Sequence, residues 1–495
     1  MPEMSTPPRL SAATLARAAA GTALPGYDRD RLGTGIVHLG LGAFVRAHLA
    51  AYTEDVLNHD FGPWGITGVS LQRPDQRDLL APQDGLYTLL ERDGTSARAR
   101  IVGCVTGLLV APESPAAVIA AMADPGCRIV SLTVTEKGYC HDPATGQLDL
   151  AHPAIRADLA NQPGSPRSAI GFLVAALARR RAAGLPPFTA LSCDNLPHNG
   201  RVLAGLVDAF ARQTDPALAD WIARHGAFPC TMVDRIVPAA TQADRDAVLA
   251  ATGLADAAPV SHEPFRQWVI EDRFVDGTRP AWESAGATIV ADVAPYEHMK
   301  LRLLNAAHSA LAYLGYLAGH ETIVDAVEDP VLRAYAERLW RTEIIPMVPP
   351  PQGVDLAAYA ADLMARFANP AIRHRTWQIA ADGSQKLPQR LLATIRERRA
   401  AGLPFPLLAH AVAGWVRYTT AIDENGAPID VRDPLAEALR ATAGPADAAR
   451  LDRILSLTAV FGGDLTRDEV FRAAVVDAHT ALIAAGARAA TERLL

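Results

Sequence analysis

Short apolar runs rich in β-branched residues alternate with longer stretches of helical periodicity throughout the chain before Pro295. This alternation is typical of a parallel sheet covered by helices, because parallel neighbouring strands need a long crossover between them. It therefore predicts an α/β fold for this part of the chain. The expected strands are Gly35–Leu39, Gly65–Leu71, Arg100–Val105, Arg128–Val134, Thr189–Cys193 and Thr231–Ile236. The expected helices include Ala43–Asn58, Ser114–Ala123, Ile170–Ala183 and Arg201–His225.

The pattern changes after Pro295, where Ala and Leu recur at helical spacing and strand signals almost vanish. We place a domain boundary near residues 285–295 and expect domains at 1–290 and 291–495, the second mainly α-helical. The segment His262–Arg279 is neither clearly helical nor clearly β. We interpret it as a connection that carries function or packs between the domains.

Charge and cysteine content exclude several classes of protein. The net charge of −7 argues against a nucleic-acid-binding surface, which would be basic. No apolar run approaches the roughly 18 residues of a membrane span, and the N-terminus lacks the basic and apolar stretches of a secretory signal. The five cysteines have neither metal-ligand spacing nor the pattern of a disulfide framework. We therefore expect a cytoplasmic protein with reduced cysteines, no metal, and no nucleic-acid or membrane partner.

The first predicted strand runs into a glycine turn and then a helix. Gly40 permits the tight turn, and Gly42, which lacks a Cβ, lets a pyrophosphate approach the N–H groups at the start of the helix. Val45 stands where the third glycine of the dinucleotide fingerprint is expected, so a plain strand-turn-helix joint is the alternative. Arg46, one turn into the helix, either adds a cation for phosphate or is surface charge.

The end of the second strand decides between NAD and NADP. An acidic residue there binds the adenosine ribose and favours NAD, and Asp75 is the candidate. Arg73 would instead meet the 2′-phosphate of NADP. Asp75 could also be a simple turn residue after Pro74. We prefer NAD and leave NADP open.

The chain has only three lysines, Lys137, Lys300 and Lys386, among 47 basic residues. Lysine, unlike arginine, can lose its proton in a protein and act as a base. Lys300 begins the pattern Lys300-x4-Asn305-x2-His308 in an otherwise apolar helix. At about 100° per residue, His308 lies about 80° and Asn305 about 140° from Lys300, so the three share one broad face.

Dry surroundings lower the pKa of a lysine, which predicts that Lys300 takes the proton of an alcohol while Asn305 donates to the developing alkoxide. The alternatives are that Lys300 reaches to water, that Asn305 bends the helix, and that His308 is a core histidine with satisfied hydrogen bonds.

A second polar group of residues follows the predicted strand Thr189–Cys193. Asp194 and Asn195 lie at its carboxyl end, the edge where ligands bind in open α/β sheets. Asn195 is a candidate oxyanion donor, and Asp194 alternatively caps the helix after Pro197. Two other strands also end in polar residues, Asp234-Arg235 and Thr135-Glu136.

With these residues in view, the chain resembles the polyol-specific long-chain dehydrogenases of the mannitol dehydrogenase family. The resemblance implies a Rossmann-type N-terminal domain that binds NAD(P), with insertions, a mainly α-helical substrate-binding C-terminal domain, and metal-free, nicotinamide-dependent oxidation of a secondary alcohol. The matching segments are GIVHLGLGAFVRAH, QDGLYTL, VTEKGY, LSCDNLPHNG, MVDRIVP, EPFRQW, RPAWE, the Lys300–His308 helix and DGSQKLP.

The resemblance also assigns roles to residues. It implies that Lys300 is the general base, that Asn195 and Asn305 form the oxyanion hole, and that His308 holds a substrate hydroxyl. Glu136 would join a proton path from Lys300 to water. It further implies that Asp234 and Lys386 contact the substrate. The residues implied to contact the cofactor are Gly40, Gly42, Phe44, Arg46 and Asp75.

Some positions differ from the usual family pattern. Val45 and Leu49 replace residues that are usually His and Gln, and Gln378 stands where mannitol dehydrogenases have Arg. The segment RHRTWQIAADGSQKLPQR is more similar to the fructuronate reductase branch, also called mannonate oxidoreductase. A hexonate needs a cation for its carboxylate, which Arg373, Arg375 or Lys386 would supply, with Gln378 beside them.

We therefore expect an NAD-dependent dehydrogenase for D-mannonate and D-fructuronate. D-mannitol and D-fructose, or another pentitol or hexitol, are the alternative substrates. A nucleotide-binding protein without enzymatic activity and an isomerase with tightly held NAD are alternatives of other classes. The resemblance implies a monomer.

Overall fold

The chain forms two compact units, Met1–Ala294 and Pro295–Leu495, each with its own core. This computed structural model describes residues 7–94, 96–142, 145–160, 164–441 and 448–495. The units are described separately below.

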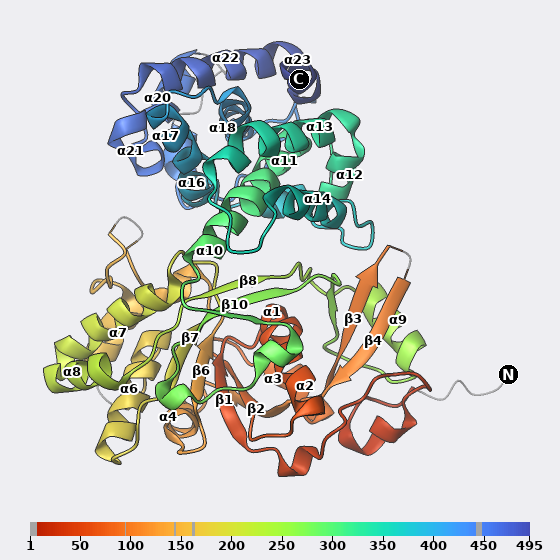
Figure 1. Ribbon diagram of the computed structural model, residues 1–495, viewed down its shortest axis with the longest axis vertical. Coiled ribbons are helices and arrows are strands. Elements are labelled where there is room, and N and C mark those ends of the chain that lie inside the picture. The colour runs from red at the N-terminus through yellow and green to blue at the C-terminus, as the bar shows by residue number, and fades with distance from the viewer. Residues whose placement is uncertain (1–6, 95, 143–144, 161–163, 442–447) are drawn as a thin grey trace. The chain divides into compact units, whose positions relative to one another are not determined.

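A five-stranded parallel sheet forms the centre of the N-terminal unit, with the strand order β5-β2-β1-β6-β7. The strand order reverses between β1 and β6, which is the point where doubly wound sheets bind ligands at their carboxyl edge. The predicted α/β, Rossmann-type fold class is therefore confirmed (Figure 1). The strands are β1 Thr34–Leu39, β2 Gly65–Ser70, β5 Val105–Val110, β6 Ile129–Leu132 and β7 Thr189–Ser192.

Alternating residues of β1 supply the cores on the two faces of this sheet. Ile36 belongs to an apolar cluster with residues of the first helices, and Val37 belongs to a second cluster with residues of α4, α6 and α7. Both side chains are fully buried. Burial of such a side chain contributes about 1.5–3 kcal/mol, so the alternation fixes which face each helix covers.

Two small sheets accompany the central one, with the orders β11-β10-β8 and β4-β3-β9. Each contains both a parallel and an antiparallel pairing. The strands are β3 Tyr87–Asp93, β4 Ser96–Val102, β8 Thr231–Asp234, β9 Val260–His262, β10 Gln267–Glu271 and β11 Thr288–Val290.

The small sheets correct three expectations. The expected strand Arg100–Val105 is divided between β4 and β5, because the N–H groups of Gly103 and Cys104 bond to the buried Glu54 carboxylate instead of to a strand. β8, from the expected strand Thr231–Ile236, pairs antiparallel with β10 and lies outside the five-stranded sheet. The unassigned segment His262–Arg279 contains β10.

The expected helix Ala43–Asn58 is broken at His48, where the backbone leaves the helical region (φ −119°, ψ −92°). His48 Nε2 lies 3.0 Å from the Gln267 carbonyl oxygen, and its ring packs against Tyr52 and Trp268. The helices of this unit are α1 Ala43–Ala47, α2 Leu49–His59, α3 Asp75–Leu80, α4 Pro115–Ala123, α5 Pro153–Ala160, α6 Ala169–Ala182, α7 Asn199–Thr214, α8 Pro216–His225, α9 Gln242–Thr252 and the start of α10 Ala294–Lys300.

The described part of the C-terminal unit contains helices and isolated bridges but no strand, which confirms the mainly α-helical prediction. Helix α11 is its centre and contacts α12, α13, α15, α18 and α23 (Figure 1). The helices are α11 Ala306–Leu317, α12 Ile323–Glu328, α13 Pro330–Leu339, α14 Leu356–Phe367, α15 Thr376–Ala380, α16 Gly383–Leu387, α17 Ala393–Ala400, α18 Pro406–Tyr418, α19 Ala436–Ala441, α20 Ala448–Leu455, α21 Thr458–Leu465, α22 Glu469–Ala485 and α23 Ala487–Leu494.

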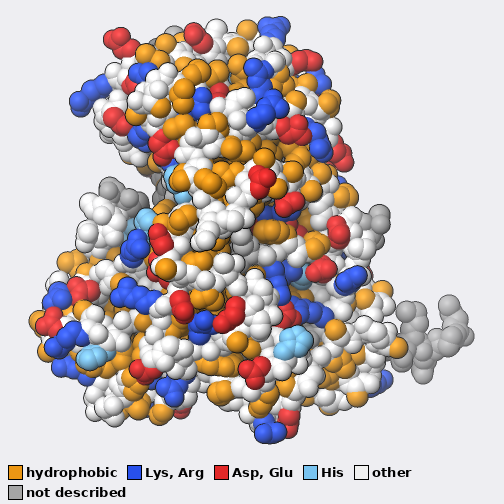
Figure 2. Space-filling model, in the orientation of Figure 1, with side chains coloured by type: hydrophobic (Ala, Val, Ile, Leu, Met, Phe, Trp, Pro, Cys, Tyr) orange, Lys and Arg blue, Asp and Glu red, His pale blue; other side chains and the backbone are white. Residues whose placement is uncertain are grey.

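Charged side chains of both signs are interspersed on the face of the N-terminal unit that Figure 2 shows. That face has no continuous basic surface of the kind that binds nucleic acid. Among the described residues, no helix combines the length and the hydropathy that a bilayer crossing requires. All five cysteines are buried free thiols.

Candidate active site

The glycine turn after β1 has one residue that only glycine fits and one that lies beside open space. Gly40 has φ +98°, and a Cβ there would lie 2.1 Å from the Thr133 carbonyl oxygen. Gly42 is exposed, and a Cβ there would meet nothing closer than the Gly40 oxygen, at 3.9 Å. Gly40 thus forms the turn, while Gly42 leaves the start of α1 accessible, which suits the approach of a pyrophosphate.

His38 connects the two strands that flank this turn. Its Nδ1 lies 2.8 Å from Ser131 Oγ, and its Nε2 lies 2.8 Å from Thr133 Oγ1, so it links β1 to β6 and to the residue after it. Burial lowers the pKa of His38 to about 3, which keeps the ring neutral. Sequence reasoning missed His38, although its place inside the glycine motif was visible.

Arg46 points into the protein. Its guanidinium donates to the Ala258 carbonyl oxygen at 2.5 Å and to Gln76 Oε1 at 3.1 Å, and it lies over the Tyr87 ring. The side chain is buried, so the surface-charge alternative is wrong. Phe44, two residues earlier, is half-buried and stacks on His48 with ring centroids 5.0 Å apart.

Asp75 is the first residue of α3 and follows the loop after β2. Its side chain is 62% exposed, and its Oδ2 lies 3.6 Å from Arg73 Nε. The acidic and the basic candidate for the ribose position are therefore neighbours, and both are open to solvent.

Asp194 joins the carboxyl ends of β6 and β7. Its carboxylate accepts hydrogen bonds from the N–H groups of Val134 and Thr135, at 3.0 and 2.9 Å, and from the Tyr139 hydroxyl at 2.9 Å. Burial raises the pKa of Asp194 to about 6 against the effect of these donors. The alternative that Asp194 caps the helix after Pro197 is wrong, because α7 begins after His198 without a side-chain cap.

Three further candidates lie at strand ends of the same unit. Asn195 follows Asp194 directly and is exposed, as is Glu136, the first residue of the short 3₁₀ turn Glu136–Tyr139. Asp234 is the last residue of β8, opposite Gln267 of β10, and is 5% exposed. These three candidates are therefore two accessible polar groups and one buried carboxylate.

In the C-terminal unit, Lys300 ends α10 and is 6% exposed. A π-helical turn, Leu301–Asn305, separates it from α11, so the expected regular helix is interrupted. The Trp340 indole N–H donates to the Leu303 carbonyl oxygen at 2.9 Å, inside this turn. A donor that enters the helical hydrogen-bond pattern is a known cause of such irregularities, and π turns are frequent at functional sites.

The burial of Lys300 contradicts the alternative that this side chain reaches to water. Asn305 is half-buried at the junction of the π turn and α11, and its carbonyl oxygen accepts from Arg390 at 3.5 Å.

His308 lies one turn further along, in a group of aromatic and basic side chains. It stacks on Phe367 at 5.0 Å and meets His374 edge-on at 5.1 Å. Its Nε2 is buried and has no hydrogen-bond partner among the described residues, which contradicts the alternative of a satisfied core histidine. Burial, followed by the nearby His374 and Arg390, holds the pKa of His308 well below its usual range. A neutral ring with an unpartnered nitrogen suits a substrate hydroxyl.

Sequence reasoning missed His374, whose pKa burial and Lys386 lower to about 4. Lys386 Nζ donates to the Ile379 and Ala381 carbonyl oxygens at 3.1 and 2.5 Å. Gln378 and Arg373 are exposed. Both Arg373 and Arg375 pair with Glu321. The structure thus gathers His308, His374 and Lys386, while Arg373 and Gln378 lie on the surface of this unit.

Comparisons with known proteins agree with this organisation. A model of the mannitol dehydrogenase Rossmann domain matches residues 34–284, and a model of the mannitol dehydrogenase C-terminal domain matches residues 292–483. The first match lies within the N-terminal unit, and the second covers most of the C-terminal unit and begins three residues before it.

Individual relatives are similar over nearly the whole chain. The D-mannonate oxidoreductase of Escherichia coli K12 is 49% identical over 94% of this chain and 96% of its own length. A mannitol 2-dehydrogenase of Phaeosphaeria nodorum is 43% identical over 94% of this chain and 82% of its own. The structure of Pseudomonas fluorescens mannitol 2-dehydrogenase, a ternary complex with NAD and D-mannitol, is 40% identical, with a TM-score of 0.91 over 98% of this chain and 99% of that one. The predicted resemblance is confirmed, and the chain belongs to the mannitol dehydrogenase family of oxidoreductases.

Proposed function

We propose that the protein is an NAD-dependent dehydrogenase that interconverts a secondary alcohol and a ketone on a linear sugar acid or polyol. The observation that carries this proposal is the burial of Lys300 in the same helical segment as Asn305 and His308. The similarity to a D-mannonate oxidoreductase and to a mannitol 2-dehydrogenase complexed with NAD and D-mannitol supports it.

NAD would lie at the glycine turn, with NADP as the alternative. Gly42 leaves room for the pyrophosphate, Gly40 shapes the turn, and Phe44 is the second residue of the helix beside it. Asp75 would bind the ribose hydroxyls, which favours NAD, whereas the neighbouring Arg73 would suit the 2′-phosphate of NADP. Arg46 would act on cofactor binding indirectly, by stabilising the conformation of α1, because its guanidinium group donates to carbonyl oxygens of the protein. When bound, the nicotinamide supplies the acceptor for the hydride.

Lys300 would be the general base. Its ε-amine takes the hydroxyl proton of the substrate as the C–H bond breaks, so that the alcohol becomes a ketone. The Asn305 amide would donate to the developing alkoxide, and we assign Asn195 the role of a second donor. Glu136, exposed and carrying a carboxylate, would pass the proton from Lys300 to water.

The remaining candidates would select the substrate. His308 would hold a hydroxyl through its neutral ring, and Asp234 and Lys386 would bind further hydroxyls. Arg373 and Lys386 are cations that would suit a substrate carboxylate, whereas the amide of Gln378 would suit a neutral hydroxyl group. We therefore propose D-mannonate and D-fructuronate as the preferred pair. D-mannitol and D-fructose are the second candidate, supported by the mannitol 2-dehydrogenase relatives. We further propose that the protein acts as a cytoplasmic monomer.

A spectrophotometric panel tests the function. NADH absorbance is followed with NAD⁺ and D-mannonate, D-mannitol, D-arabinitol, D-sorbitol or D-altronate, and then with NADP⁺. We expect the highest kcat/KM for D-mannonate with NAD⁺. NADH binding without turnover of any compound would favour a nucleotide-binding protein instead, and substrate conversion without net NADH would favour an isomerase.

A further inference from the structure

The N-terminal unit contains a cavity of about 680 Å³. None of the candidate active-site residues lines it, although Arg235, the neighbour of Asp234, does. It opens beside the sheet β4-β3-β9 and borders Arg235, which follows β8. Gly40, Gly42, Phe44 and Asp75 are not among its lining residues, so it is separate from the glycine turn. Its volume is in the range that holds a small organic ligand.

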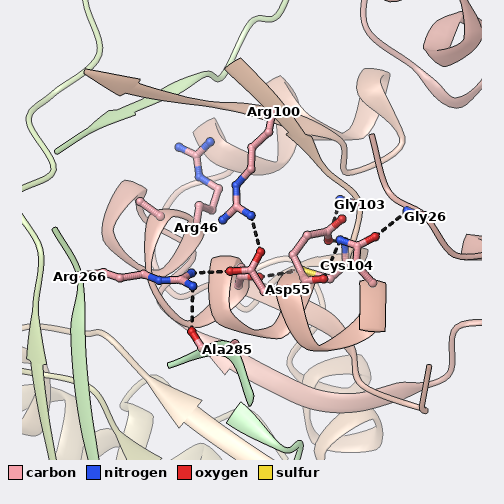
Figure 3. Close-up of polar contacts among 12 residues, drawn as sticks. Gly26, Arg46, Asp55, Arg100, Gly103, Cys104, Arg266 and Ala285 are labelled. Carbon is pink, nitrogen blue, oxygen red and sulfur yellow. Dashed lines mark hydrogen bonds and ion pairs between the residues drawn. The ribbon is translucent and has the colours of Figure 1, made fainter. Parts of the chain in front are cut away.

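The lining of this cavity is basic. Four guanidinium groups and two carboxylates face it, and 4 − 2 leaves an excess of two positive charges. The Asp55 carboxylate lies between two of the arginines, 2.5 Å from Arg100 and 2.6 Å from Arg266 (Figure 3). The charged groups are Asp55, Glu91, Arg98, Arg100, Arg235 and Arg266.

Arg235 is the most buried of these cations, with 8% of its surface exposed. Its guanidinium group donates hydrogen bonds to backbone carbonyl oxygens, that of Ala47 at 2.5 Å and that of Glu263 at 3.1 and 3.2 Å. Burial, followed by the nearby Arg266 and Arg100, lowers the pKa of Arg235 to about 10. An anion that enters the cavity therefore stabilises this buried cation, which lies close to other positive charges.

His262 adds a hydrogen-bond acceptor to the cavity, which an anion without a hydroxyl group cannot satisfy. Its Nδ1 lies 2.7 Å from the Glu263 carbonyl oxygen, which can only accept, so Nδ1 carries the proton and Nε2 is an acceptor. The side chain is 2% exposed and lines the cavity, and its Nε2 has no hydrogen-bond partner among the described residues. Burial lowers the pKa of His262 to about 3, so the ring is neutral and Nε2 needs a donor such as a hydroxyl.

We propose that this cavity binds a small hydroxylated organic anion, a sugar phosphate or a sugar acid. Its anionic group lies against the guanidinium groups of Arg100, Arg235 and Arg266, and one of its hydroxyls donates to His262 Nε2. The Glu91 carboxylate accepts from another hydroxyl and disfavours an anion without hydroxyls. This site does not depend on the proposed dehydrogenase activity, because Lys300 and the glycine turn take no part in it.

Isothermal titration calorimetry on the full chain, saturated with NADH, tests the proposal. Saturation with NADH keeps anions out of the dinucleotide site. Glucose 6-phosphate and D-gluconate distinguish the sugar phosphate from the sugar acid, inorganic phosphate presents the charge without hydroxyls, and myo-inositol presents hydroxyls without charge. We expect one of the two hydroxylated anions to bind at least about tenfold more tightly than phosphate, and myo-inositol not to bind.

Three variants locate the site. Arg100→Gln should weaken the binding of the preferred anion about tenfold, and Arg98→Gln, at the exposed edge of the cavity, should weaken it a few-fold. His262→Phe should weaken the preferred anion but leave phosphate unchanged. Arg179→Gln, an exposed arginine of α6 outside the cavity, is the matched control and should leave all affinities unchanged.

Arg98→Gln remains informative if Arg100→Gln unfolds, because the Arg98 side chain is exposed. The absence of binding by both hydroxylated anions at millimolar concentration would overturn the proposal. Unchanged affinities in both arginine variants would also overturn it. The same holds if phosphate and the hydroxylated anions bind equally tightly and His262→Phe changes neither affinity.

Discussion

The Asp194 carboxylate accepts a 2.9 Å hydrogen bond from the N–H of Thr135, a residue whose φ of +61° and ψ of +166° lie in a region that threonine rarely adopts. Such a conformation costs about 1–3 kcal/mol and persists only where neighbouring contacts impose it. The second carboxylate oxygen holds the Val134 N–H, so Asp194 sets the backbone that presents Glu136.

Asp194→Asn should therefore lower both stability and activity. An asparagine has one acceptor oxygen, and its amide N–H₂ would face a backbone N–H that the carboxylate now binds. We expect a loss of about 1–3 kcal/mol in the free energy of unfolding, measured with urea, and a fall in kcat/KM. Asp208→Asn, in an exposed pair with Arg212 on α7, is the control and should change neither quantity appreciably. Wild-type stability in Asp194→Asn would show that these hydrogen bonds do not hold the turn.

Lys300→Ala should reduce turnover by orders of magnitude while the protein still binds NADH. The substitution removes the proposed base, and added methylamine should restore part of the activity by replacing the missing amine. Lys300→Arg is the matched variant, because it keeps the positive charge but cannot release its proton. Both variants should be inactive in the NADH assay. Full activity of either would exclude Lys300 as the base.

The two glycines of the turn should respond differently to alanine. Gly40→Ala should lower the free energy of unfolding by at least about 2 kcal/mol, because φ is +98° and the new Cβ would collide with the Thr133 carbonyl group. Gly42→Ala should leave stability nearly unchanged, since φ is −90° and the position is open. Its NADH affinity should fall about tenfold. Thermal melts and NADH fluorescence measure the two effects, and tight NADH binding by Gly42→Ala would place the pyrophosphate elsewhere.

Acid should destabilise the protein partly through His410 of α18. Burial lowers the pKa of this residue from 6.5 to about 4, so the unfolded state binds more protons between these values. Its contribution to stability is therefore complete above about pH 6.5 and is lost as the pH falls toward 4. From pH 7.5 to pH 5 the loss should be about 2 kcal/mol.

His410→Gln should remove this part of the pH dependence. Glutamine does not titrate and keeps a donor for the Thr491 hydroxyl, which lies 2.9 Å from His410 Nε2. Urea denaturation measures the free energy of unfolding at pH 7.5 and at pH 5. The difference between these two values should be smaller in His410→Gln than in the wild type by about 2 kcal/mol. His59→Gln, at an exposed position, should retain the wild-type difference. Equal pH dependence in the wild type and His410→Gln would show that His410 titrates alike in both states.

Much of the fold could be read from local patterns. The β-branched runs around Gly35–Leu39 and Thr189–Cys193 gave strands of the parallel sheet, and Gly40 gave the turn that only glycine fits. The motif segments identified the family. These features follow from backbone preferences and hydrophobic periodicity, which a short stretch of sequence expresses by itself.

Other features depended on contacts between distant residues. His374 meets His308 although 66 residues separate them, and the expected strand Arg100–Val105 is divided because Glu54, far away in sequence, takes its N–H groups. Arg46 points inward because the Ala258 carbonyl group, 212 residues away, accepts its hydrogen bond. No local pattern contains such pairings.

The sequence by itself thus determined the periodicity of each segment, the glycine turn and the family. Tertiary structure alone decided the π turn after Lys300, the unpartnered nitrogen of His308 and the basic cavity around Arg235. Helix and strand preferences act between neighbours in sequence, whereas burial, charge crowding and the choice of hydrogen-bond partner arise only when distant segments pack together.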